Sequence, residues 1–408
     1  MTDKNSHNSQ FTIPNGWVET TLGEVCEIIM GQSPKGETYN LEGNGLPFYQ
    51  GITEFDEKYV KIKTYTSEPT KVIEPNTILF SVRAPVGRVN FTKHKSCIGR
   101  GNAGLKMNNG NQEFLFYLLR FLEKQIQNRT SGTVFDSISG KELKEITIIV
   151  PTNPNEQKAI ASVLSAFDDK IELLREQNKT LEEIGQTIFK EWFGKYSPER
   201  PEELPEGWRV GKLGEEFDIT IGRTPPRAES QWFSDTPTSK KWISIKDIVN
   251  SGTYIFNSSE YLTDEAIEKF NIPIIPENTT ILSFKMTVGK LTITTEEMLS
   301  NEAIAHLKLK NDSVLSSEFI YLCLKNLNFN ALGSTSSIVT AINSTMIKNL
   351  EVIIPYHETM KKFDEAIQPI FAKIKDNSEQ IQTLARTRDT LLPKLMKGEL
   401  RVSGFGNN

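Results

Sequence analysis

The stretch Pro14–Glu24, with the sequence PNGWVETTLGE, returns 191 residues later as Pro205–Glu215, with the sequence PEGWRVGKLGE. A second pair follows at the same spacing, Gly31–Pro34 (GQSP) and Gly222–Pro225 (GRTP). A duplication of this length predicts two similar domains, because solenoid repeats are only about 20–50 residues long. Two similar domains in one chain suit a target that is itself read in two parts.

The chain of 408 residues is long enough to bury two or more cores of ordinary domain size. Hydrophobic residues make up 37% of it, and no apolar run reaches the ~18 residues needed to span a bilayer. The polar segment Met1–Gln10 lacks the apolar core of a signal peptide. We therefore expect a cytoplasmic protein without a membrane segment.

Cysteine and histidine usage argues against disulfides and metal sites. The three cysteines are scattered and odd in number, which disfavours a disulfide framework. The four histidines show no ligand spacing with the cysteines, so we predict no metal site in this chain. The net charge of −5 counts mildly against nucleic-acid binding, but acidic helices can mask a basic face elsewhere.

Each repeat begins with short strand-like segments that Gly, Pro and Asn interrupt. Thr77–Arg83 has a counterpart in Thr280–Met286, and Val86–Arg88 has one in Val288–Lys290, so the spacing drifts to 202 or 203 residues. The pattern further predicts a short amphipathic helix and a closing strand in each repeat: Phe114–Leu122 and Ile146–Pro151, then Phe319–Leu327 and Leu350–Pro355.

A long helix is predicted after each repeat. The first begins behind Asn153, which can cap it, with Pro154 at the first helical position and Glu156 completing a capping-box-like pattern. The second lacks this start, and Pro393 should kink or loosen its last turn.

Both helices carry apolar residues at alternating spacings of four and three. Sustained heptads of this kind predict a coiled coil; two independent amphipathic helices, each packed on its own domain, are the alternative. The first seam is Ile160, Leu164, Phe167, Ile171, Leu174, Asn178, Leu181, Gly185, Ile188 and Trp192. The second seam is Phe363, Ile367, Ile370, Ile374, Asn377, Ile381, Leu384, Arg388, Leu391 and Leu395.

An antiparallel alignment of the two seams places Asn178 opposite Asn377, and every other seam residue then also faces a seam residue. A paired polar residue in an apolar seam fixes the register at a cost in stability, which is the role we predict for this pair. Gly185 and Arg388 also interrupt the apolar pattern of their seams, because neither has an apolar side chain. Domains at equivalent ends of antiparallel helices are related by a pseudo-twofold axis, and helices of ~40 residues span about 60 Å.

The predicted fold class is α+β, with two tandem α/β domains joined by two long helices that form an antiparallel, pseudo-twofold symmetric coiled coil. Each domain precedes one helix. The expected segments are a polar tail, 1–13; a first domain, 14–153; a central spacer helix, 154–194; a linker, 195–204; a second domain, 205–356; a C-terminal spacer helix, 357–397; and a tail, 398–408.

The motifs that resemble catalytic or cofactor sites lack the context that such sites need. Gly99–Gly104 fits the dinucleotide fingerprint GxGxxG, but a strand-like segment follows it where a helix is required, so we interpret it as a loop. Asn153–Glu156 resembles a methyltransferase motif without its aromatic residue, and helix capping explains it. The chain contains no Walker A motif and no GxSxG elbow. We therefore predict a binding protein with no catalytic residues.

Candidate contacts with DNA are basic and polar side chains in the loops of the repeats. Arg and Lys can contact phosphates or guanine edges, and Ser and Thr can bind phosphates. The best motivated recur at equivalent places, such as Arg83 with Lys285 and Arg88 with Lys290. The full set is Lys35, Tyr39, Arg83, Arg88, Arg100, Arg129, Ser131 and Thr133 in the first repeat, and Arg223, Arg227, Lys246, Lys285, Lys290, Ser334, Thr335 and Ser336 in the second.

In this order, these segments resemble the specificity subunit of type I restriction-modification systems. The resemblance covers Pro14 to Val402 and rests on the twice-used Gly-Trp-x(4)-Leu-Gly opening and the Gly-x-Ser/Thr-Pro segment. Glu156-Gln157 at the start of the first long helix and the closing segment Leu391–Leu400 extend it. The second long helix departs from it, with Tyr356–Thr359 in place of the Glu-Gln start.

The resemblance implies two target-recognition domains, each reading one half of a bipartite double-stranded DNA site. Their unlike middles, Tyr39–Ile73 and Gln231–Ile274, indicate an asymmetric target. The paired helices would set the spacer and dock two methyltransferase (modification) subunits, which restriction (translocase-nuclease) subunits join. S-adenosylmethionine, ATP and magnesium would belong to those partners. The alternatives are a stand-alone DNA methyltransferase or nuclease, and a two-domain scaffold with no nucleic-acid role.

Overall fold

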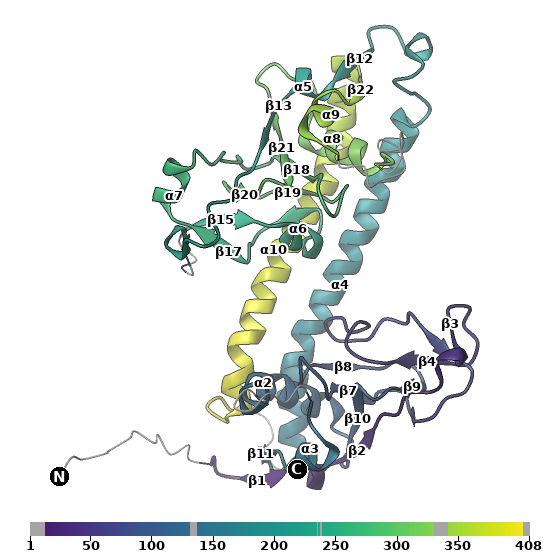
Figure 1. The fold of residues 1–408 in the computed structure, drawn as a ribbon, viewed down its shortest axis with the longest axis vertical. Helices are drawn as coiled ribbons and strands as arrows, with labels where there is room; N and C mark the ends of the chain where they lie inside the picture. The colour runs from purple at the N-terminus through teal and green to yellow at the C-terminus, as the bar shows by residue number, and fades with distance from the viewer. Residues whose placement is uncertain (1–12, 131–136, 235, 237–238, 330–341, 403–408) are drawn as a thin grey trace, which may run out of the picture. The chain divides into compact units, whose positions relative to one another are not determined.

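The computed structural model describes residues 13–130, 137–234, 236, 239–329 and 342–402. The chain forms two compact units, one made of residues 1–171 and 383–408 and the other of residues 172–382. Figure 1 shows the two repeats, each of mixed α and β structure, and the two long helices α4 (Pro154–Phe193) and α10 (His357–Met396). The unit boundaries lie inside these helices, so each unit contains one repeat and a length of both helices.

The first repeat is closed by its own ends, because β1 (Trp17–Thr21) pairs antiparallel with β11 (Thr147–Pro151). Its four-stranded sheet consists, in order, of β2 (Cys26–Met30), β10 (Asn102–Met107), β7 (Ile78–Ser81) and β8 (Val89–Phe91). Its five-stranded sheet consists, in order, of β3 (Tyr39–Asn40), β5 (Tyr65–Thr66), β4 (Leu46–Tyr49), β9 (Ser96–Ile98) and β6 (Val72–Ile73). Its helices are α1 (Leu22–Val25), α2 (Gln112–Thr130), α3 (Gly140–Lys144) and the 3-10 turn η1 (Gly36–Thr38).

The second repeat follows the same plan, with β12 (Arg209–Lys212) paired antiparallel to β22 (Glu351–Ile354). Its five-stranded sheet consists, in order, of β13 (Phe217–Ile221), β21 (Ile304–Leu309), β18 (Thr280–Ser283), β19 (Leu291–Thr294) and β16 (Tyr254–Ile255). Its four-stranded sheet consists, in order, of β14 (Phe233–Ser234), β17 (Glu260–Leu262), β15 (Lys240–Ile243) and β20 (Leu299–Ser300). Its helices are α5 (Leu213–Glu216), α6 (Ile245–Asn250), α7 (Asp264–Lys269), α8 (Ser317–Lys325) and α9 (Ser344–Lys348), with 3-10 turns η2 (Pro201–Glu203) and η3 (Ser230–Trp232).

Matching hydrogen bonds show that the two repeats are aligned with a spacing of 202 residues through these sheets. Ser81 Oγ accepts from the backbone N of Arg88 at 2.9 Å, and Ser283 Oγ accepts from that of Lys290 at 3.1 Å. The spacing of 203 that pairs Thr77 with Thr280 is therefore wrong by one residue.

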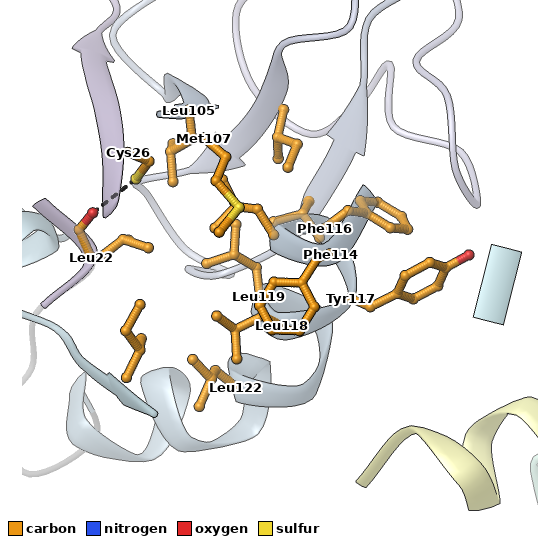
Figure 2. Close-up of a cluster of buried hydrophobic side chains, with 14 of the residues drawn as sticks. Leu22, Cys26, Leu105, Met107, Phe114, Phe116, Tyr117, Leu118, Leu119 and Leu122 are labelled. Carbon is orange, nitrogen blue, oxygen red and sulfur yellow. Dashed lines mark hydrogen bonds between the residues drawn. The ribbon is translucent and has the colours of Figure 1, made fainter. Parts of the chain in front are cut away.

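Helix α2 supplies much of the core of the first unit, as Figure 2 shows. The side chains of Phe114, Phe116 and Leu119 on this helix are fully buried, and they pack with Leu105 and Met107 of β10. Helix α2 extends to Thr130, well beyond the predicted end at Leu122. The predicted amphipathic helix of the second repeat is present as α8.

The asparagines of the seam meet inside the second unit. Asn377 is fully buried, and its Nδ2 donates to Asn178 Oδ1 at 2.9 Å. Asn178 Nδ2 in turn donates to Ser378 Oγ at 2.9 Å. Trp192 and Phe363, which the antiparallel alignment places opposite each other, have ring centroids 5.9 Å apart. The role of the asparagine pair in fixing the register stays a prediction.

The two interruptions of the seams, at Gly185 and Arg388, have separate structural explanations. In the first unit Arg388 is buried, and its guanidinium forms an ion pair with the buried carboxylate of Asp168, which also accepts from the Tyr117 hydroxyl at 2.6 Å. In the second unit Gly185 leaves room for the ring of Phe371, which lies 3.5 Å from where a Cβ atom would stand. In the first unit, the charge of Arg388 is thus neutralised by an ion pair. In the second unit, the ring of Phe371 occupies the space beside Gly185, which has no side chain.

The repeated tryptophans, Trp17 and Trp208, contact opposite ends of helix α4. Trp17 Nε1 donates to Glu156 Oε1 at 3.2 Å, and Glu156 also binds Arg401. The capping-box role predicted for Glu156 is therefore wrong, although Asn153 Oδ1 does accept from the N of Asn155 at 2.9 Å. Trp208 packs instead on Phe193, with ring centroids 5.6 Å apart.

Candidate nucleic-acid interface

The turn after β7 in the first repeat and the turn after β18 in the second share the same hydrogen bonds to a serine hydroxyl. The hydroxyl of Ser81 accepts from Arg88 and donates to the carbonyl of Pro85 at 2.7 Å, and Ser283 makes the same two contacts with Lys290 and Thr287. The turns need a glycine near their ends, since Gly87 and Gly289 have φ of +92° and +83°. Both turns thus present basic residues from a fixed backbone.

The Gly-x-Ser/Thr-Pro segments pack backbone to backbone against a second turn. Gly31 N donates to Asn102 O at 2.9 Å, and Gly222 N donates to the corresponding Ile304 O at 3.2 Å. A Cβ atom on Gly31 would stand 2.1 Å from Gly99 O, and one on Gly222 would stand 2.2 Å from Ser300 O. Only glycine fits this close approach, which explains why the glycine recurs in both repeats.

A further backbone contact joins this second turn to the first. Val82 N donates to Gly101 O at 3.0 Å, and Phe284 N donates to Ala303 O at 3.0 Å. Three segments therefore form one surface in each repeat. We define the first loop face as residues 31–34, 82–88 and 99–101, and the second loop face as residues 222–225, 284–290 and 301–303.

The first loop face brings together three of the predicted cations. Arg83 and Arg100 are exposed, and both line a pocket of about 120 Å³ with Gln50. Arg88 is half-exposed and lies 3.3 Å from Glu123. An exposed ion pair of this kind contributes only about 0–1 kcal/mol, so Arg88 can exchange Glu123 for a phosphate.

The second loop face carries Lys285, Lys290 and Arg223, all with exposed side chains. Arg223 Nη1 donates to Phe270 O at 2.9 Å, which holds the guanidinium beside α7. Its own carbonyl accepts from Trp242 Nε1 at 3.1 Å. The backbone of Arg223 is thus fixed from two sides, because its N also donates to Ser300 O at 2.9 Å.

Two other candidates in the second repeat lie outside this face. Arg227 binds Glu260 through both Nη atoms, and its guanidinium carbon lies 4.6 Å from the ring centroid of Trp242. The hydrogen bond with Glu260 raises the pKa of Arg227 above its ordinary value. Its contacts are those of a structural cation. Lys246 is exposed on α6.

The remaining candidates of the first repeat divide into one exposed cation and one structural ring. Lys35 is exposed and lies 3.8 Å from Glu37. The Tyr39 hydroxyl donates to Pro34 O at 3.1 Å, and its ring packs on Phe48 with centroids 4.7 Å apart. The other predicted contacts lie outside the residues whose side chains the structure describes: Arg129, Ser131, Thr133, Ser334, Thr335 and Ser336.

Sequence reasoning missed Glu302, which lies on the second loop face at the position of Arg100 in the first. The Thr224 hydroxyl of the Gly-x-Ser/Thr-Pro segment donates to its carboxylate. That hydrogen bond lowers the pKa of Glu302, and the positive charges of Lys285 and Arg227 lower it further. Glu302 is acidic and therefore does not belong to the predicted set of cations. The spacing of 202 residues that aligns the repeats identifies it as the counterpart of Arg100.

A buried histidine, His306, contacts Ser300, which directly precedes residues 301–303 of the second loop face. His306 Nδ1 lies 3.0 Å from Thr220 Oγ1, and its Nε2 lies 2.7 Å from Ser300 Oγ. Burial lowers the pKa of His306 to about 3, with a smaller contribution from Lys308. The imidazole is therefore neutral at physiological pH and bridges the strands that carry Ser300 and Thr220. Gly104 occupies this place in the first repeat.

Across the part of the chain that the structure describes, no helix combines the length and apolarity that crossing a membrane requires.

The Gly99–Gly104 segment leads into strand β10, so the structure shows the strand that its sequence context predicted.

The sequence profile of the family described as "Type I restriction modification DNA specificity domain" matches residues 14–183 and 205–386. The type I restriction enzyme MjaIX specificity subunit of Methanocaldococcus jannaschii is 28% identical over 418 residues, covering 96% of this chain and 95% of the relative. The putative MjaX specificity subunit of the same organism is 44% identical over 181 residues, covering 43% of this chain and 42% of the relative.

Among solved structures, a type I restriction-modification system S subunit from M. genitalium aligns with a TM-score of 0.58 at 20% identity. The alignment covers 97% of this chain and 99% of that one. At this level of identity the likeness supports the fold, with two repeats and two long helices.

Proposed function

Because this chain belongs to the family of type I restriction modification DNA specificity domains, we propose that it selects the DNA target of a type I restriction-modification complex. Each repeat reads one half of a bipartite, asymmetric double-stranded site. The chain contributes recognition and no catalytic residue, as the name "specificity subunit" of its relatives implies for them.

The observation that carries this proposal is the pair of loop faces. Both faces have the same backbone hydrogen bonds and the same close-packed glycine, which keeps their geometry alike. Both also expose cations at matching places, Arg83 with Lys285 and Arg88 with Lys290. The side chains between these cations differ, and such differences on a common scaffold would read unlike half-sites.

The partners follow from the same family. Two methyltransferase (modification) subunits dock on the paired helices, and restriction (translocase-nuclease) subunits join that core. S-adenosylmethionine, ATP and magnesium are used by those partners and not by this chain. The complex acts on DNA in the cytoplasm, where its target lies.

The test exchanges one repeat at a time. The chain is purified with its modification subunits, and methylated sites are mapped on a randomised DNA library. Replacing residues 14–153 with those of a relative should change one half of the methylated site and leave the other half intact. A change in both halves would show that the repeats do not read separately. Methylation by the isolated chain would show that it is itself an enzyme.

Cation contacts with phosphates are tested by salt dependence. Arg83→Gln and Lys285→Gln should each lower the slope of log affinity against log salt by about one, because each removes one phosphate contact. Lys394→Gln, at an exposed position near the end of α10, is the matched control and should leave the slope unchanged.

A further inference from the structure

Arg100 and Glu302 occupy the same position in the two repeats but carry opposite charges. Each lies in the turn that ends on Gly101 or Ala303, whose carbonyls accept the matching 3.0 Å hydrogen bonds from Val82 and Phe284. Both side chains are exposed. The backbone therefore presents a cation on the first loop face and a carboxylate at the equivalent point of the second.

The hydroxyl of the Gly-x-Ser/Thr-Pro segment contacts this position in both repeats. Ser33 Oγ accepts from the backbone N of Arg100 at 3.2 Å and lies 3.5 Å from its Nε. Thr224 Oγ1 instead donates to the carboxylate of Glu302. A hydroxyl can accept or donate, so one scaffold can hold either charge in place. This gives the Ser/Thr of the repeated segment a physical role.

Glu302 is ionised in this setting, because the hydrogen bond from Thr224 holds its pKa below the ordinary value. A carboxylate on a surface that faces DNA is repelled by phosphates and cannot contribute to backbone binding. It can, however, accept from the exocyclic amino group of a base, as Glu and Asp do with cytosine N4. Arginine has the opposite preference and donates to guanine O6 and N7.

We propose that Arg100 and Glu302 are equivalent base-reading residues of opposite sense, positioned by Ser33 and Thr224. Arg100 donates to guanine in the half-site of the first repeat, and Glu302 accepts from cytosine N4 in the half-site of the second. This inference rests on the proposed function and specifies which residues distinguish the two half-sites.

The experiment uses the full complex of this chain with its modification subunits and a library of duplexes randomised over both half-sites. Glu302→Gln, which keeps the shape of the side chain, should lower the preference for one base pair in one half-site by about 10-fold or more. Arg100→Gln should do the same at one base pair of the other half-site. Thr224→Val should weaken the same preference as Glu302→Gln, because it removes the hydrogen bond that positions the carboxylate.

The matched control is Glu202→Gln, a change of the same kind at an exposed position on η2, outside both loop faces. It should leave every base preference unchanged. Thermal unfolding of each variant shows that the fold is retained.

A uniform change in affinity across all sequences, or no change, would overturn the assignment of Glu302. The assignment would also be overturned if Arg100→Gln and Glu302→Gln lowered the base preference at one and the same position of the site. If the unaltered complex shows no base preference in either half-site, the proposed function itself fails, which is a different result from a preference that survives the substitutions.

Discussion

Asp168 and Arg388 form a buried ion pair where the seam of α10 has a charged residue in place of an apolar one. Counted from Ile160 and Phe363, the first seam residues of their helices, Asp168 corresponds to Phe371 and Arg388 corresponds to Gly185. A charged pair in the first unit thus replaces a ring and a glycine in the second.

Arg388→Met should lower the free energy of unfolding by about 1–3 kcal/mol, because the buried carboxylate of Asp168 loses the guanidinium that binds its Oδ1. The loss is partial, since Asp168 Oδ2 keeps the Tyr117 hydroxyl and Arg120, whose Nη1 lies 3.6 Å away. Adding Asp168→Asn should recover part of this loss, since a neutral amide can still accept from Tyr117. Denaturant unfolding of the single and double variants measures both effects. Lys394→Met is the exposed control, and a double variant less stable than Arg388→Met would contradict the interpretation.

His306 makes stability depend on pH in the second unit. Its pKa is about 3 in the folded chain, because burial disfavours the imidazolium, and about 6.5 when unfolded. Above pH ~6.5 both states are neutral and the full stability is present. As the pH falls below that value only the unfolded state takes up the proton, so this stability is lost at up to about 1.4 kcal/mol per pH unit.

His306→Gln should therefore flatten the decline in unfolding free energy between pH 6.5 and pH 4.5, while lowering stability at neutral pH, relative to the unaltered chain. His94→Gln, at an exposed position, is the control and should keep the original slope. Parallel pH profiles for His306→Gln and the unaltered chain would contradict the role of burial.

At the scale of the elements, the seam of α4 and α10 is the feature that heptad spacing predicts well. The alignment pairs Asn178 with Asn377, and they form a side-chain hydrogen bond. The bounds of the long helices were also predicted well: 154–194 and 357–397 were expected, and α4 is Pro154–Phe193 and α10 is His357–Met396. Pro393 does not end α10, because its last turns are packed by buried residues such as Leu395. Helix α2, in contrast, exceeds its predicted length.

Asn178→Leu alone should destabilise the chain by about 1–3 kcal/mol, because the buried amide of Asn377 loses its partner. The double variant Asn178→Leu/Asn377→Leu should regain this stability but lose the preference for one register. Cysteines at 181 and 374, which face each other in the alignment, measure the register through disulfide yield. A double variant that retains both stability and the full yield would show that the asparagines do not fix the register.

At the scale of the whole molecule, the two helices run through both units and carry the spacer function that we propose. Inserting one heptad between Ile171 and Glu172, and one between Thr383 and Leu384, lengthens both helices at facing seam positions. Each insertion adds about 10 Å of helix, equivalent to about 3 base pairs of DNA. Site mapping should show the same two half-sites with a longer spacer.

An insertion in α4 alone is the control for that experiment. It shifts one seam against the other by one heptad, so the original seam partners on both sides of the insertion cannot meet at the same time. Recognition of the two half-sites should therefore be lost. Unchanged spacer length after the matched insertions would show that the helices do not act as the ruler.

The sequence by itself determined the duplication, the order of domains and helices, and the seam, because these depend on local spacing and periodicity. It also indicated Arg83 with Lys285 and Arg88 with Lys290 as matching cations. Only the tertiary structure decided that Arg227 and Tyr39 are held by neighbours, and that Glu156 binds Trp17. Such contacts join residues far apart in the chain, and no local pattern encodes them.

The repeated Gly-x-Ser/Thr-Pro segment shows the same division most clearly. Its recurrence is visible in the sequence, but the reason for its glycine and its hydroxyl is not. The glycine is required by a backbone that approaches from about 70 residues later in the chain, at Gly99 or Ser300. The hydroxyl serves Arg100 or Glu302, which that same approach brings beside it. Folding therefore places opposite charges at one position of two otherwise similar faces.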